Sequence, residues 1–166
     1  VFRFEDGRAV EHWDNIQERL GPNQSGHTMV DGPIAAVDHE LTENNRALVR
    51  SFIETILLGG QLDRLTDYIN DSNYIEHNPR LGDGVDTLRL ELEAMYKDSK
   101  RIDYHHIHRI LAEGNFVLCI SEGDFDGIHS AFYDLFRVAE GKLVEHWDTT
   151  EKIALRKEWK NNNGKF

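Results

Sequence analysis

The pattern of apolar and polar positions changes once along this chain, near residue 100. Before that point, apolar side chains recur at helical spacing, which predicts three helices, over 42–58, 61–70 and 85–97. A short strand is predicted at 74–78. After it, apolar and polar side chains alternate, which predicts four strands, over 102–111, 116–125, 131–138 and 142–149. Helices followed by an antiparallel meander indicate an α+β domain, with helices packed on one face of a curved sheet.

The last two predicted strands form a hairpin around the loop at 139–141, where Gly141 supplies a left-handed position. With a three-residue loop, the numbers of facing residues sum to about 280. The facing pairs on one side are then Asp134 and His146, Phe132 and Asp148, and Phe136 and Val144. Two acids and an imidazole among aromatic rings are typical of the wall of a pocket rather than of an ordinary core.

The hairpin sequence occurs twice. Residues 1–14, VFRFEDGRAVEHWD, align with residues 135–148, LFRVAEGKLVEHWD, at a constant offset of 134. This repeat predicts that 1–14 is a remnant hairpin of a preceding repeat, carrying His12 and Asp14 in place of His146 and Asp148. The next stretch carries three glycines and two prolines and has no regular period. We therefore expect four segments: the hairpin at 1–14, an extended linker at 15–41, one domain at 42–150 and a partly ordered tail at 151–166.

Charge and composition exclude several classes of function. The net charge of −11 argues against binding to nucleic acid, which requires clustered lysine and arginine. No apolar run approaches the roughly 18 residues that would span a membrane. The single cysteine, Cys119, rules out an intramolecular disulfide framework and is expected to be a buried apolar filler. We expect a cytoplasmic protein.

Three stretches resemble SnoaL-like polyketide cyclases of the nuclear transport factor 2-like superfamily, which also holds ketosteroid isomerase and limonene epoxide hydrolase. They are Tyr-Ile-Glu-His-Asn-Pro at 74–79, Ala-Glu-Gly at 112–114 and the closing hairpin at 133–148. The resemblance covers residues 42–150 and implies a cone-shaped fold that encloses a deep pocket. It further implies an enzyme without metal or cofactor, which binds an apolar small molecule bearing a carbonyl group and performs an aldol-type cyclisation or an isomerisation.

The resemblance also implies that the acid of an Asp-x-x-Arg pattern, here Asp134, points into the pocket as the general acid/base. Phe132 and Phe136 would wall it, and desolvation among apolar walls raises the pKa of a carboxyl group toward working pH. The other reading of Asp134 is a solvent-facing acid. His146 is either its orienting partner or a half-buried histidine bound to a backbone carbonyl, and the sequence leaves both open.

Four further residues are candidates for substrate binding. Tyr74 and Asn78 share a face of the short strand, while His77 faces the other way. Asn78 occupies the place of the proton-shuttling acid of the isomerases, where an amide can only orient a substrate oxygen. Glu122 lies where some cyclases carry a pocket histidine and is expected to be exposed, and Asp148 near the sheet edge is expected to be solvated.

No metal site is expected. Of the histidines at 105, 106 and 108, only His106 and His108 share a face, and no acid or cysteine recurs nearby at ligand spacing. Two alternatives to an enzyme remain: a small-molecule-binding domain without chemistry, and a dimerising domain. Because both faces of the closing hairpin carry apolar residues, we expect a homodimer in which residues 1–14 pair with, or cover, a sheet.

Overall fold

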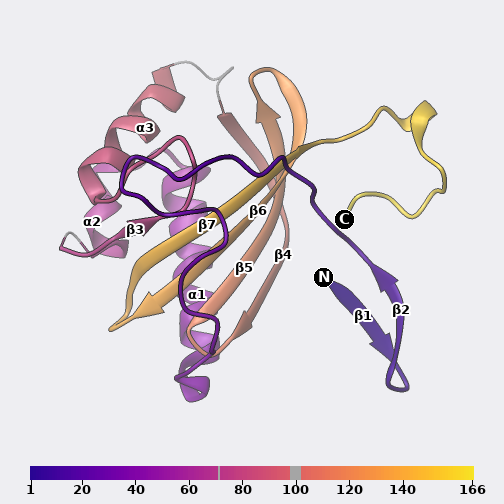
Figure 1. Ribbon diagram of the computed structural model, residues 1–166, viewed down its shortest axis with the longest axis horizontal. Helices are drawn as coiled ribbons and strands as arrows, with labels where there is room; N and C mark the ends of the chain where they lie inside the picture. The colour runs from indigo at the N-terminus through magenta and orange to yellow at the C-terminus, as the bar shows by residue number, and fades with distance from the viewer. Residues whose placement is uncertain (71, 98–101) are drawn as a thin grey trace.

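The computed structural model describes residues 1–70, 72–97 and 102–166, and its main body is a curved five-stranded sheet with helices on one side (Figure 1). The strands lie in the order β3-β7-β6-β5-β4, antiparallel except that β3 runs parallel to β7. Their bounds are β3 Ile75–Glu76, β4 Ile102–Glu113, β5 Phe116–Phe125, β6 Ile128–Ala139 and β7 Lys142–Lys152. The α+β architecture predicted from the sequence is therefore confirmed.

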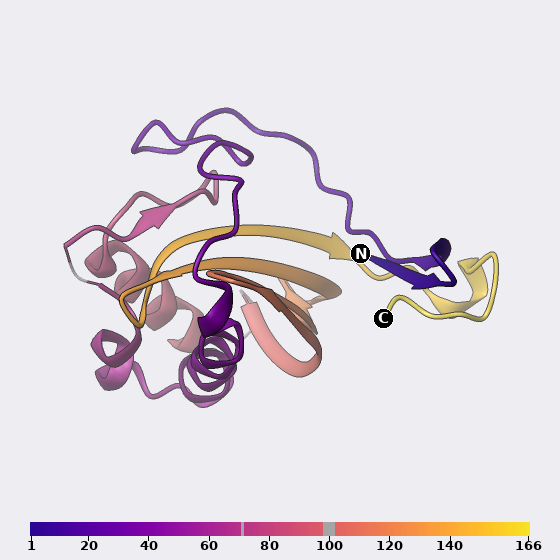
Figure 2. The same ribbon diagram turned by 90° about the horizontal axis from the view of Figure 1, so that it is seen from below.

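The helices cover one face of the sheet and form the core with it (Figure 2). They are α1 Thr42–Phe52, which continues through a π-helical turn at Ile53–Leu57, then a 3₁₀ turn at Leu62–Arg64 with α2 Leu65–Tyr68, and finally α3 Val85–Lys97. The apolar stripes of the helices form one core with the inner face of the sheet, where Phe52 of α1 meets the edge of Phe136 with ring centroids 5.6 Å apart. Cys119 is buried in this core, as expected. Within the described residues, no helix is long and apolar enough to span a membrane.

The closing hairpin differs from the prediction in its turn. The loop contains two residues, Glu140 and Gly141, both with positive φ (52° and 71°), as a type I′ turn requires. A bulge between Arg137 and Val138 then shifts the register, so that Asp134 faces Asp148 and Phe136 faces His146. The predicted opposition of Asp134 and His146 was wrong by two residues. A shift of two keeps every side chain on its face, so the predicted grouping survives.

The bulge has a second effect, on the residues next to the turn. Val144, predicted to face Phe136, lies at the bulge, and Leu143 joins the helix-side core instead. Phe132 faces Thr150 rather than Asp148. The bulge thus moves the turn end of β7 by one position while the site end keeps its orientation.

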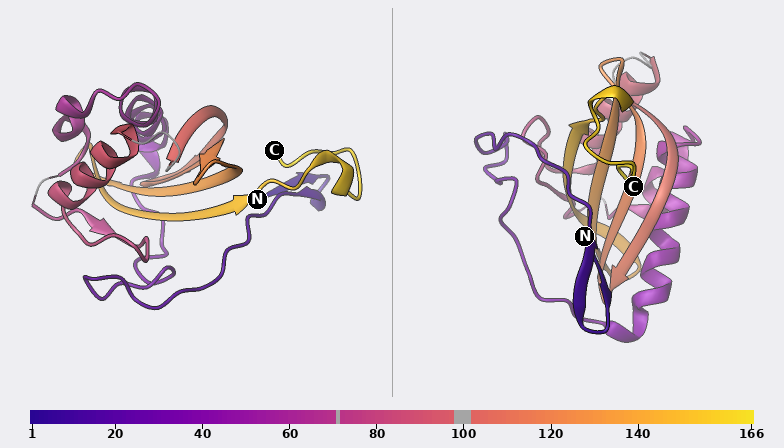
Figure 3. Two further views of the ribbon diagram at one scale, coloured as in Figure 1. Left: turned by 90° about the horizontal axis from the view of Figure 1, so that it is seen from above. Right: turned by 90° about the vertical axis from the view of Figure 1, so that its right-hand side faces the viewer.

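The N-terminal residues form a separate two-stranded sheet, β1 Phe2–Glu5 and β2 Arg8–His12, beyond the end of the main sheet (Figure 3). In the single chain this hairpin does not join the five-stranded sheet. Residues 15–41 follow as an irregular segment that ends in a 3₁₀ turn at His39–Leu41. This segment passes over the sheet on the side away from the helices (Figure 2).

The ends of the linker and of the chain are tied to the domain by side chains. The hydroxyl of Thr42, the first residue of α1, accepts a hydrogen bond from the backbone N–H of Gly114 at 2.9 Å and so joins the helix to the β4–β5 turn. The C-terminal segment contains a 3₁₀ turn at Arg156–Glu158 and folds back, and the ring of Phe166 stacks on His108 at 3.8 Å.

Candidate active site

A cavity of about 400 Å³ opens where the first residues of the linker meet the ends of β6 and β7, within the size range of small-molecule sites. Its buried end is formed by Phe132, Tyr104, Asn78 and Asp148, and its open end carries charged side chains. The complete lining is Gln17, Glu18, Leu20, Asn78, Pro79, Arg80, Leu81, Glu91, Ile102, Tyr104, Phe125, Asp126, Ile128, Ser130, Phe132, Asp148, Thr150 and Lys152. Of the eight site residues predicted from the sequence, three line the cavity, namely Asn78, Phe132 and Asp148. The other five do not: Tyr74, Glu122, Asp134, Phe136 and His146.

Asp148 and Asn78 form a carboxyl–amide pair at the buried end of the cavity. The Asn78 Nδ2 donates to Asp148 Oδ2 at 2.8 Å, while the buried Asp148 Oδ1 has no hydrogen-bond partner among the described residues. Desolvation, with the nearby carboxylates of Glu76 and Asp134, raises the pKa of Asp148 to about 6. The expectation that Asp148 is solvated was wrong, because the linker and the 78–81 segment close over the end of β7.

Three ionisable side chains, Glu76, His146 and Asp134, lie deeper in the fold than this pair and contact one another in series. His146 Nδ1 is 3.1 Å from both carboxylate oxygens of Glu76, and His146 Nε2 is 3.3 Å from Asp134 Oδ1. Since both ring nitrogens face carboxylate acceptors, both carry a proton and the ring is an imidazolium. Burial alone would lower the pKa of His146, but the two carboxylates raise it well above its ordinary value.

Asp134 is buried and does not line the cavity. Tyr104 lies between them, and its hydroxyl donates to the Asp134 carboxylate at 3.2 and 3.3 Å. Burial and the charge of Asp134 raise the pKa of Tyr104 well above its ordinary value, so this phenol stays protonated. The structure thus brings Asp134 and His146 together, as the sequence suggested, and the Tyr104 hydroxyl connects Asp134 to the cavity.

The short strand β3 supplies Glu76, one of the two carboxylates that contact His146. Glu76 accepts hydrogen bonds from the Tyr74 hydroxyl at 3.1 Å and from the backbone N–H groups of His77 and Asn78 at 3.0 and 2.9 Å. Burial would raise the pKa of Glu76, but the His146 imidazolium outweighs it and the pKa is lowered. Tyr74 therefore binds Glu76 rather than the cavity, and Phe136 stacks on His146 with centroids 4.7 Å apart.

Glu122 lies away from the cavity. Its carboxylate approaches His129 at 3.2 Å and His108 at 3.5 Å, and it does not contact any cavity-lining residue named above through a hydrogen bond. His106 and His108 share a face with ring centroids 4.7 Å apart, as the alternation predicts. Glu122 therefore belongs to a polar group that spans β4, β5 and β6 rather than to the candidate site.

Two residues of the candidate site, Tyr104 and Glu76, were not among the site residues predicted from the sequence. Tyr104 pairs with Gly123, and the chain is so close there that a Cβ on Gly123 would lie 2.0 Å from the Asp103 carbonyl oxygen. A glycine inside a predicted strand is a signal of such a bulge, and the bulge turns Tyr104 inward. Glu76 shares the alternation of Tyr74 and Asn78, which placed it on the inner face, but nothing in the sequence identified its partner.

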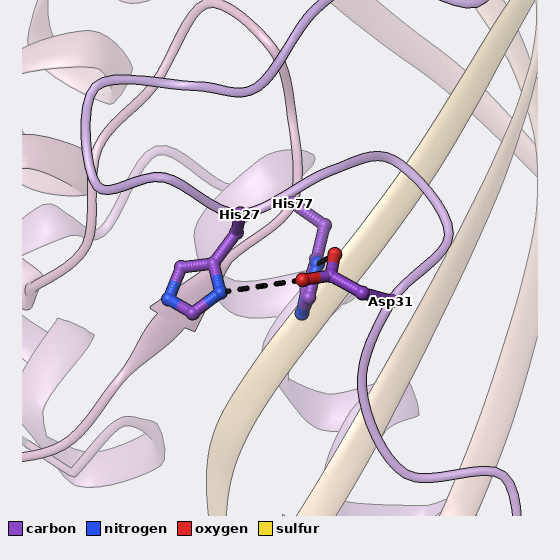
Figure 4. A group of neighbouring side chains, drawn as sticks. All are labelled: His27, Asp31 and His77. Carbon is purple, nitrogen blue, oxygen red and sulfur yellow. Dashed lines mark hydrogen bonds and ion pairs between the residues drawn. The ribbon is translucent and has the colours of Figure 1, made fainter.

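One further cluster has the composition of a metal site: His27, Asp31 and His77, whose ligand atoms lie within 4.8 Å of one another (Figure 4). His77 Nδ1 faces the Thr28 carbonyl oxygen at 2.8 Å, and His77 Nε2 faces Glu145 Oε1 at 2.8 Å. Both ring nitrogens of His77 thus already face protein oxygen atoms at hydrogen-bond distance, so neither is free to bind a cation. The cluster instead fastens the linker to the outer face of β7.

Comparison of the sequence with protein-family models and with curated proteins finds no match. Several solved structures are similar to the structure of this chain. A candidate ketosteroid isomerase from Kribbella flavida is 14% identical with a TM-score of 0.61, over 75% of this chain and 93% of that chain. A SnoaL-like polyketide cyclase from Agrobacterium tumefaciens is 12% identical with a TM-score of 0.55, over 65% of this chain and 91% of that chain.

A third structure, a nuclear transport factor 2-like protein of unknown function from Cytophaga hutchinsonii, is 18% identical with a TM-score of 0.53, over 72% of this chain and 95% of that chain. Identities this low establish the fold and leave the reaction open. The chain therefore has the nuclear transport factor 2-like fold, the fold of SnoaL-like polyketide cyclases and ketosteroid isomerase-like proteins that its closing hairpin and its order of elements predict.

Proposed function

We propose that the protein is a cofactor-independent enzyme that transfers a proton on a small, carbonyl-bearing molecule, in an isomerisation or an aldol-type cyclisation. The observation that carries the proposal is the Asp148 carboxyl group: it lines a cavity of suitable size, leaves Oδ1 without a partner among the described residues and has a pKa of about 6. A group with a pKa near working pH can both take and return a proton.

Asp148 is the better candidate for the general acid/base, in place of Asp134. Asp134 already accepts hydrogen bonds from Tyr104 and His146, and Tyr104 separates it from the cavity. We assign Asp134 a positioning role: its negative charge and that of Glu76 hold the His146 imidazolium, and it orients the Tyr104 hydroxyl. The nearby carboxylates in turn help to keep the pKa of Asp148 high.

In the proposed reaction, Asp148 Oδ1 takes a proton from the carbon next to the substrate carbonyl, and the electron pair of the broken C–H bond moves into an enolate. In an isomerisation, the Asp148 carboxylic acid returns the proton to another carbon of the conjugated system. In an aldol cyclisation, the enolate carbon attacks a second carbonyl carbon, a C–C bond forms, and the acid protonates the new alkoxide. The Asn78 amide holds Asp148 Oδ2, so Oδ1, which has no hydrogen-bond partner among the described residues, is the oxygen that takes the proton.

The test uses 2-tetralone, a flat ketone with acidic C–H bonds next to its carbonyl, in deuterated water. Nuclear magnetic resonance should detect enzyme-dependent deuterium incorporation at those carbons, rising with pH through about 6 as Asp148 ionises. Asp148→Asn should lower this rate by about 100-fold or more, whereas Asp134→Asn should lower it less. Exchange by Asp148→Asn at the wild-type rate would refute the proposal.

The alternative function is a binding domain of the same fold that holds an apolar molecule without chemistry. The observation that favours it is the Asn78–Asp148 pair itself, since a protonated acid beside an amide can simply bind a ligand carbonyl and hydroxyl. Binding of 2-tetralone without any deuterium exchange, at equal affinity in wild type and in Asp148→Asn, would favour this second function.

A further inference from the structure

The N-terminal hairpin repeats the closing hairpin of the domain residue by residue in three dimensions. Adding 134 to each number in the pairs Phe2–His12, Arg3–Glu11, Phe4–Ala9 and Glu5–Arg8 gives the pairing of β6 with β7. The bulge between Arg3 and Phe4 falls where the other hairpin has its bulge between Arg137 and Val138. Both loops contain two residues with positive φ, 47° and 73° in one and 52° and 71° in the other.

The side-chain contacts are repeated as well. Phe2 stacks on His12 with centroids 5.5 Å apart and an interplanar angle of 25°, and Phe136 stacks on His146 at 4.7 Å and 22°. Arg3 Nε bonds Glu11 Oε2 at 2.9 Å, just as Arg137 Nε bonds Glu145 Oε2 at 2.6 Å. A short hairpin has many possible sequences and registers, so agreement in turn, bulge and cross-strand contacts indicates one duplicated structural unit rather than chance.

The two hairpins differ in how far their apolar faces are covered by other residues. Phe136 is 2% exposed, because α1 packs on it, whereas its counterpart Phe2 is 61% exposed. Phe4, the counterpart of the buried Val138, is 62% exposed. A two-stranded hairpin with an open apolar face is marginally stable alone. The face that the domain hairpin buries against helices is present in the N-terminal hairpin, and nothing within the described residues covers it.

We infer that residues 1–14 are the closing hairpin of a second domain of this same fold, encoded upstream of Val1 in the same polypeptide, and that Phe2 and Phe4 pack on the helices of that domain. The constant offset assigns each position: the residue that precedes Val1 corresponds to Asp134, and His12 and Asp14 correspond to His146 and Asp148. The upstream domain would thus hold a second pocket with its own buried histidine and acid.

The linker supports a tandem arrangement of two such domains. Directly after the hairpin, Asn15 Nδ2 donates to the carbonyl oxygens of Ala131 and Thr149 at 3.1 and 2.9 Å, and Gln17 Oε1 accepts from the Thr150 N–H at 2.6 Å. Gln17, Glu18 and Leu20 then border the cavity. The first residues of the linker are therefore bound to the downstream domain and form one wall of its cavity. These bonds also hold the N-terminal hairpin near the C-terminal end of β7.

The test compares hydrogen–deuterium exchange in the 166-residue chain and in the full product of its gene. In the full product, the backbone amides of 2–12 should exchange about 100-fold or more slowly than in the 166-residue chain, approaching those of 136–146, which serve as the internal reference. The upstream sequence should read as three helices and a meander with an acid directly before Val1. Phe2→Ala should abolish the added protection, whereas Glu5→Ala, which introduces the residue found at position 139, should not.

Three outcomes would overturn the inference. The first is a gene that encodes no such domain before Val1, and the second is equal exchange of 2–12 in the two proteins. The third is protection of 2–12 in the 166-residue chain that rises with protein concentration, because the hairpin would then be covered by a second copy of this chain.

Discussion

Asp148 carries a carboxyl group whose charged form the folded state disfavours. Its pKa is about 6 in the fold, against 3.8 for an ordinary aspartate, so the folded state holds more protons than the unfolded state between these two values. The free energy of unfolding therefore falls as pH rises through this window, and the loss is complete above about pH 6. The same desolvation that would make Asp148 a useful base costs the protein stability at neutral pH.

The prediction at this scale concerns Asp148→Asn, which keeps the shape and removes the charge. Its stability relative to wild type should be greater at pH 7.5 than at pH 4.5 by about 1 kcal/mol or more, measured by urea unfolding at both pH values. Asp126→Asn, at an exposed acid on the open end of the cavity, is the matched control and should show no such difference. Parallel pH profiles for wild type and Asp148→Asn would contradict the prediction.

The sequence predicts which residues of β6 and β7 belong to the candidate site better than it predicts their roles. Alternation grouped Asp134, His146 and Asp148 on one face, and a period of two makes that grouping insensitive to an even shift of register. It could not show that Tyr104 intervenes before the cavity, since that depends on a bulge in β4. Nor could it show that the linker closes over Asp148, because the linker has no periodic pattern from which a position can be read.

The elements themselves follow closely from local signals. The predicted bounds of α3 and β5 match the structure, because apolar residues at regular spacing define both and Gly84 and Gly114-Asn115 precede them. The helix predicted over 61–70 is shorter, a 3₁₀ turn followed by Leu65–Tyr68. The turn of the closing hairpin was missed by one residue, because Glu140 adopts a left-handed conformation (φ 52°) that its residue type does not announce.

This turn gives the prediction at the scale of an element. Glu140→Asn should raise the stability of the domain by about 0.5–1 kcal/mol, because asparagine tolerates positive φ and Asn-Gly is the favoured pair of a type I′ turn. The change would appear as a higher midpoint of thermal unfolding. Asp126→Asn, in the equivalent Asp126-Gly127 turn between β5 and β6, should give a smaller gain, because Asp-Gly is already favoured. A lower midpoint for Glu140→Asn would contradict the prediction.

At the scale of the whole molecule, the linker determines which surface of the sheet remains open. On the outer face, Trp147 Nε1 donates to the Asp31 carbonyl oxygen at 2.8 Å, and the Trp147 ring stacks on His77. The linker therefore covers apolar residues of β6 and β7 that a second copy of the chain was expected to cover. The linker in turn presents its own apolar side chains outward: Val30 is 67% exposed and Ile34 is 96% exposed. The outer surface at this place is therefore still apolar, although it now belongs to the linker and not to the sheet.

We therefore expect a homodimer that uses this linker surface. Sedimentation velocity at micromolar concentrations should show a dimer for wild type and a monomer for Ile34→Asp, because a charge at this position would be buried without a partner in the dimer and fully solvated in the monomer. The matched control is Leu90→Asp on α3, where the leucine is 68% exposed on the helical side of the sheet, and it should leave the dimer intact. A monomeric wild type, or a dimer that withstands Ile34→Asp, would show that the outer surface of the linker is not the interface.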